Sequence, residues 1–81
     1  MSDKLKQLEK ELAETRAVIE RTSSLRGKAA QESTRLEAGI DTLLPEDVLT
    51  YAAKRRELND AGELYTRIIY NRQLRADQLT S

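Results

Sequence analysis

The stretch Ile40–Leu49, "IDTLLPEDVL", divides the chain almost equally at its single proline, Pro45. Proline is tolerated in the first turn of a helix, where its missing N–H would have no partner, and it disfavours helical geometry at the preceding residue, Leu44. Glu46 and Asp47 follow, and they place negative charge at the positive end of a helix dipole. The stretch therefore predicts that one helix ends before it and a second begins at Pro45.

Both halves of the chain carry apolar residues at the spacing of an amphipathic helix. We predict an all-α fold, an antiparallel two-helix hairpin that resembles a short coiled coil and forms a single domain over residues 1–81. Its helices are expected at residues 3–40 and 45–78, with a turn at 41–44. The residues expected in the seam between the helices are Leu8, Leu12, Ile19 and Leu36 in the first half and Tyr51, Leu58, Tyr65, Ile68 and Ile69 in the second.

Three glycines interrupt this pattern and carry separate expectations. Gly27 lies in the polar middle of the first helix, where it costs about 1 kcal/mol relative to alanine and could mark a kink or a break. Gly39 suits a left-handed cap at the end of that helix. Gly62 lies within the apolar stripe of the second helix, where we expect it to allow a close crossing of the two backbones.

Composition excludes several classes of function. Basic and acidic residues both number 14, so no positive excess is available to neutralise a nucleic-acid backbone. The chain has no cysteine and no histidine, which removes thiolate chemistry and the usual general base and metal ligand. No apolar run approaches the length that crosses a bilayer, and the charged N-terminus is unlike a secretory signal peptide. We therefore expect a cytoplasmic protein that binds neither nucleic acid nor membrane and carries no cofactor or metal.

Carboxylate pairs are the remaining source of catalytic chemistry. Glu11 and Glu14 lie three residues apart, as do Asp60 and Glu63, so each pair shares a helix turn. A catalytic carboxylate needs a pocket that shifts its pKa, and two slender helices offer none. The sequence therefore indicates solvated helix surfaces and no enzyme.

A second apolar surface is expected outside the seam. Tyr70 and Leu74 project about 140–180° away from Tyr65 on a helical wheel of 100° per residue, and Leu49 lies on roughly the same side. Tyrosine is enriched at the centres of protein interfaces. A single hairpin rarely buries enough apolar area to offset chain entropy, so we predict that Leu49, Tyr70 and Leu74 bind a protein partner.

The segments "PEDVLTYAAKRREL" and "AGELYTRIIYNRQL" resemble the second helix of the small co-chaperones of type III secretion needle subunits, the YscE/SsaE-like family. The matching features are a tyrosine near the start of the helix, Tyr51, and an aliphatic–tyrosine cluster near its end at Ile68, Ile69 and Tyr70. The first half matches only as a charged amphipathic helix that carries leucines.

The resemblance implies a cytoplasmic chaperone that binds a tetratricopeptide-like co-chaperone through helix faces. Together the two proteins would hold the needle subunit and keep it unpolymerised before export. The residues alone also allow an alternative function. The chain would then be a structural hairpin that self-associates as a four-helix homodimer and acts as a small adaptor or regulator.

Overall fold

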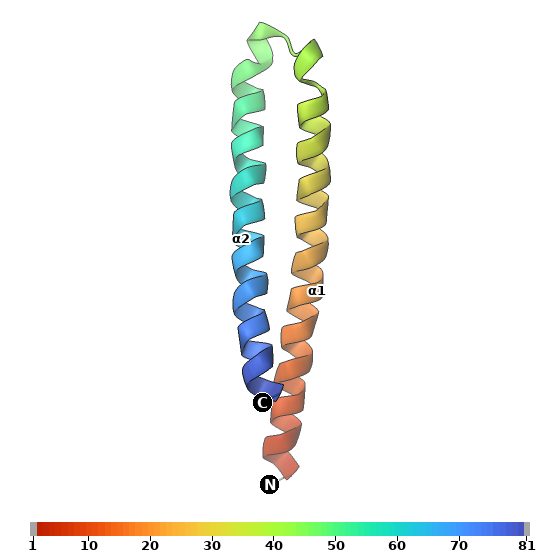
Figure 1. Ribbon diagram of the computed structural model, residues 1–81, viewed down its shortest axis with the longest axis vertical. Helices are drawn as coiled ribbons and strands as arrows, with labels where there is room; N and C mark the ends of the chain where they lie inside the picture. Colours follow the sequence, from red (N-terminus) through yellow and green to blue (C-terminus); the bar gives the residue numbers. More distant parts are fainter. Residues whose placement is uncertain (1, 81) are drawn as a thin grey trace.

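Two long helices lie antiparallel, side by side, in the computed structural model, which describes residues 2–80 (Figure 1). Helix α1 spans Ser2–Ala38 and helix α2 spans Val48–Thr80, joined by the short 3-10 helices η1, Ile40–Thr42, and η2, Pro45–Asp47. The molecule measures 65 × 16 × 14 Å. The predicted all-α antiparallel hairpin is confirmed.

The reversal of the chain is made by Leu43 and Leu44, which lie between the two 3-10 helices. Both are extended, with φ/ψ of −70°/127° and −81°/146°. Leu44 has this conformation because the ring of Pro45 excludes helical geometry from the residue before it. The backbone N–H of Leu43 donates to the Ile40 carbonyl at 3.1 Å, and that of Asp47 donates to the Leu44 carbonyl at 2.9 Å. The 3-10 helices thus supply hydrogen-bond partners on both sides of the bend.

The helix bounds differ from the predicted ones by one to three residues. Helix α1 ends at Ala38 rather than residue 40, and the regular part of α2 begins at Val48 rather than Pro45 and continues to Thr80. The left-handed cap predicted at Gly39 is wrong, because its φ/ψ of −86°/−2° is right-handed. Its N–H donates to the Leu36 carbonyl at 3.1 Å, so the last turn tightens into η1 without a left-handed residue.

Gly27 and Gly62 lie inside continuous helices. Helix α1 passes through Gly27 without a break. A Cβ atom added at Gly62 would meet no atom within 4 Å outside its own helix backbone, and the same holds at Gly27. The close crossing predicted at Gly62 is therefore wrong, since the facing helix leaves room for a side chain there.

The two ends of the hairpin differ. The first turns of α1 extend beyond the C-terminal end of α2, so part of its apolar stripe has no neighbouring helix (Figure 1). Leu5, in this overhang, is 61% exposed. Further along, Glu11 faces Arg75, and near the loop Glu37 faces Arg55. These two pairs connect the first part of α1 to the last part of α2, and the end of α1 to the beginning of α2.

Candidate protein-binding surfaces

The seam between the helices is built from small and polar residues as much as from apolar ones. The two buried residues of the described chain are threonines, Thr15 at 2% and Thr22 at 7% exposure, and no apolar residue of that region is buried. Each lies at a position where a coiled coil would place a leucine or isoleucine in the seam. The hairpin therefore has a contact line rather than a closed apolar core.

The hydroxyls of Thr22, Thr34, Thr66 and Thr80 are satisfied within their own helix. The Thr22 hydroxyl donates to the Val18 carbonyl at 2.6 Å, and the Thr66 hydroxyl donates to the Gly62 carbonyl at 3.0 Å. A hydroxyl bonded four residues back carries little cost of burial, because it leaves no unpartnered donor. It also makes no bond to the other helix, so it adds little to the attachment between α1 and α2.

Seven of the nine residues expected in the seam are half-buried. Leu8 and Ile68 are the exceptions, at 38% and 40% exposure, so they lie at the margin of the seam and not within it. The half-buried residues are Leu12, Ile19, Leu36, Tyr51, Leu58, Tyr65 and Ile69. The Tyr51 hydroxyl is buried and has no hydrogen-bond partner among the described residues, so Tyr51 contributes the area of its ring.

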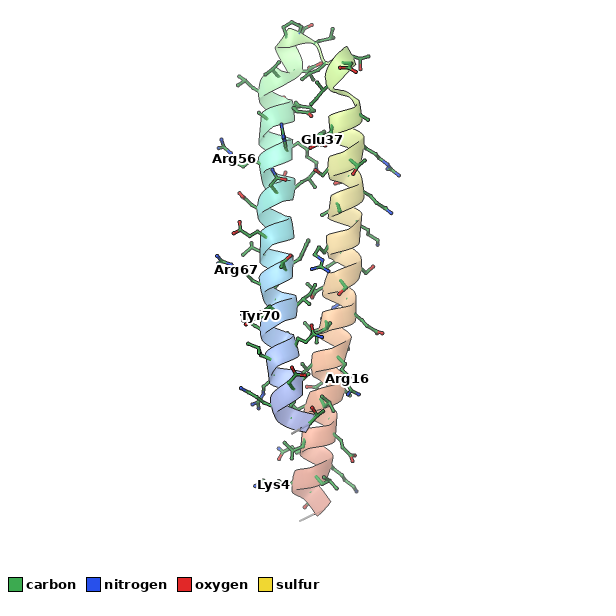
Figure 2. All side chains as sticks on the ribbon, viewed as in Figure 1. Lys4, Arg16, Glu37, Arg56, Arg67 and Tyr70 are labelled. Atoms are coloured by element: carbon green, nitrogen blue, oxygen red, sulfur yellow. The ribbon has the colours of Figure 1, made fainter. Side chains whose placement is uncertain are left out.

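The three residues expected to bind a partner are all exposed, Leu49 at 84%, Tyr70 at 64% and Leu74 at 47%. Tyr70 lies on the side of α2 that faces away from α1, as do Arg56 and Arg67 (Figure 2). Tyr70 and Leu74 are one turn apart and form a pair. Leu49 is 21 residues before Tyr70, or about 31 Å along the helix, so it does not join that pair.

A second exposed apolar surface lies on another side of the hairpin and was missed by sequence reasoning. A shallow groove of about 460 Å³ runs between the helices, and charged residues such as Lys28, Glu32 and Glu57 form part of its lining. Its apolar lining is Leu25, Ala29, Leu58, Ala61 and Tyr65.

Leu64 and Ile68 continue this surface along α2, because they lie three and seven residues after the groove residue Ala61 and so share its side of the helix. They are 57% and 40% exposed, and Leu25 on α1 is 43% exposed. We call Leu25, Leu64 and Ile68 the groove face. The four-residue spacing of Leu64 and Ile68 was the signal that could have indicated it.

Charged side chains join the helices at both ends of the seam. One carboxylate oxygen of Glu11 accepts hydrogen bonds from Nε and Nη2 of Arg75 at 3.0 and 2.6 Å, and Arg55 approaches Glu37 at 3.9 Å. Glu14, Asp60 and Glu63 are exposed, and within residues 2–80 no three acidic side chains are placed to hold a metal ion.

We expect replacement of Arg75 by alanine to lower the free energy of unfolding by less than about 1 kcal/mol, because both partners are nearly half exposed and the pair is screened by water. Thermal unfolding followed by circular dichroism at low and high salt would measure this. A loss of several kcal/mol that persists at high salt would contradict the expectation.

The comparisons with known proteins give no relatives for this arrangement. No family model, no curated protein and no solved structure matches the chain. No helix within residues 2–80 is long and apolar enough to cross a membrane.

Proposed function

We propose that the chain is a non-catalytic protein-interaction module whose apolar surfaces are completed by a protein partner. The observation that carries the proposal is the lack of a closed core. Among the described residues no apolar residue is buried, and eleven large apolar residues are exposed over the hairpin. Burial of apolar area is the main favourable term in folding, and a hairpin with a partial core stays close to the limit of stability. A partner that binds only the folded hairpin stabilises it by mass action.

The accessible surface supports the same proposal. The hairpin exposes 6777 Å² for a mass of 9.2 kDa. A compact monomer of that mass exposes roughly 4,900 Å², so the hairpin carries an excess of roughly 1,900 Å². A standard protein interface takes about 800 Å² from each partner, so the excess leaves room for one or two such interfaces.

The specific role that we propose is that of a cytoplasmic co-chaperone in type III secretion, as the resemblance of "AGELYTRIIYNRQL" to the YscE/SsaE-like family implies. Its partner would be a tetratricopeptide-like co-chaperone, and the two would hold a needle subunit unpolymerised. Support comes from Tyr70, which lies on the side of α2 that α1 does not cover, and from Leu74, which is exposed one turn further along the helix. Stacked helical repeats form concave surfaces that suit a helix with such anchors.

We expect the double substitution Tyr70→Ala and Leu74→Ala to weaken partner binding at least tenfold while the helicity of the protein alone changes little. Both side chains are exposed in the hairpin, so their loss removes interface area and not seam area. The partner would be captured from a native lysate, identified by mass spectrometry, and titrated calorimetrically against wild type and variant.

Arg56→Ala is the matched control, because Arg56 lies on the same side of α2 and is also exposed. Equal binding by wild type and the double variant would contradict the assignment of Tyr70 and Leu74. A stable homodimer that captures nothing from the lysate would contradict the chaperone role itself.

A self-associating structural module is the second candidate function. The observation that favours it is the groove face, where Leu25, Leu64 and Ile68 are exposed on a different side of the hairpin from Tyr70.

A further inference from the structure

We propose that a second copy of this chain packs on the groove face, antiparallel to the first, about a two-fold axis that passes close to Arg21 in α1 and Thr66 in α2. The product is a four-helix bundle in which every helix is antiparallel to its immediate neighbours. The inference is independent of the co-chaperone role, since Tyr70 and Leu74 stay exposed on the outside of such a bundle.

The apolar residues of the groove face match each other about this axis. In an antiparallel pairing of identical helices, residues at equal distances on either side of the axis lie opposite each other. Leu64 and Ile68 are each two residues from Thr66, so Leu64 of one copy lies opposite Ile68 of the other, and the reverse. Leu25 and Ala17 are each four residues from Arg21, so the leucine of one copy meets the small alanine of the other.

The charges of α1 match about the same point. Lys10 and Glu32 are each eleven residues from Arg21, and Glu14 and Lys28 are each seven residues from it. Seven and eleven residues are close to whole numbers of helical turns, so these side chains share the side of α1 on which Arg21 lies. Each therefore lies opposite a residue of the other sign in the second copy. Arg21 meets its own copy on the axis, which is the one like-charge pair on this side of α1.

Helix α2 repeats the pattern with its own centre. Glu57 and Arg75 are each nine residues from Thr66, so they too lie opposite each other between the copies. In this register Arg75 is bonded to Glu11 of its own chain and joins a cluster with Glu57 of the second copy.

The two centres lie at similar heights along the hairpin. Arg75 faces Glu11 and Arg55 faces Glu37. Because both helices rise equally per residue, the Glu11–Arg75 pair places Arg21 level with residue 65 of α2 and the Glu37–Arg55 pair places it level with residue 71. Thr66 lies within this range. A single two-fold axis therefore serves both helices. The reversal of charge about this level favours a second copy as the occupant, because an unrelated partner would have no need of a face whose charges reverse about its middle. The zero net charge of the chain adds no repulsion between copies.

Sedimentation equilibrium of the purified full chain tests the proposal. We expect wild type to sediment at twice its mass of 9.2 kDa and the pair Leu64→Glu with Ile68→Glu to raise the dimer dissociation constant at least a hundredfold. The matched control is Tyr70→Glu with Leu74→Glu, which places the same two charges at the same spacing on another side of α2 and leaves the constant unchanged. Circular dichroism at low concentration reports whether each variant keeps its helices.

A charge exchange tests the register. In the Glu14→Lys variant, the new lysine of each copy lies opposite Lys28 of the other copy, so two repulsive pairs form. We expect this variant to weaken the dimer roughly tenfold at low salt. Adding Lys28→Glu restores the pairing and the affinity. Within one chain Glu14 and Lys28 are about 21 Å apart along the helix, so the rescue reports contact between copies.

Any of three results would overturn the proposal. The wild type could sediment as a monomer at 100 µM, or the two double glutamate variants could have equal dimer dissociation constants. The third result is a Glu14→Lys, Lys28→Glu variant whose dimer is as weak as that of Glu14→Lys alone. A monomer that still captures a partner from lysate would overturn the dimer and leave the co-chaperone role standing.

Discussion

Replacing Ile69 with aspartate is expected to unfold the hairpin at 25 °C. Ile69 is half-buried in the seam, and loss of its side chain removes up to about 2–3 kcal/mol of apolar burial, while a carboxylate there loses part of its hydration. A fold with no buried apolar residue among those described has little stability in reserve. The expected result is loss of most of the helical signal in circular dichroism, measured at a single low concentration.

The neighbouring residue provides the control. Tyr70→Asp introduces the same side chain one residue later, on a side of α2 that does not face α1, and Tyr70 is 64% exposed. It has a similar cost in helix propensity, below about 1 kcal/mol. We expect this variant to keep its helicity. An equal loss of helical signal in both variants would show that packing of Ile69 in the seam does not hold the helices together.

Replacing both Gly27 and Gly62 with alanine is expected to raise the melting temperature by roughly 5–15 °C. Glycine within a helix is less favourable than alanine by about 0.5–1 kcal/mol, and the two gains add because the added methyl groups share no contacts. Neither added Cβ meets an atom within 4 Å beyond its own helix backbone, so no packing cost offsets the gain. In a domain of this size 1 kcal/mol moves the midpoint by about 4–8 °C.

The reverse substitution checks that the effect comes from the backbone. Ala30→Gly removes a methyl group from an exposed site in the middle of α1 and is expected to lower the free energy of unfolding by about 1 kcal/mol. If Gly62→Ala lowered the melting temperature while Gly27→Ala raised it, the helices would approach each other at Gly62 more closely than the structure shows.

The fold could be predicted because its determinants are local. Pro45 marks the bend through its own ring and its effect on Leu44, and the spacing of Leu12, Ile19 and Leu36 marks a helix face without any knowledge of what covers it. The separation of Tyr65 and Ile69 from Tyr70 follows from helix geometry alone.

What failed depended on how one helix sits against the other. Gly62 was expected at a close crossing, and its contacts are set by the separation and rotation of α1, which a single helical wheel does not contain. Ile68 lies at the edge of the stripe, where a small rotation decides between seam and solvent, and it is 40% exposed. The groove face was missed for the same reason, since it combines Leu25 of α1 with Leu64 of α2.

The extended conformation at Leu44 also determines whether α1 packs on the α2 of its own chain or on the α2 of another chain. Had residues 39–47 continued as helix, α1 and α2 would form one straight rod. Two such rods could exchange halves, so that α1 of one chain packed on α2 of the other with every seam contact kept. This is domain swapping, and its cost depends on the energy needed to straighten the hinge. By opposing helix at Leu44, Pro45 makes the hinge costly to straighten, and each α1 stays with the α2 of its own chain.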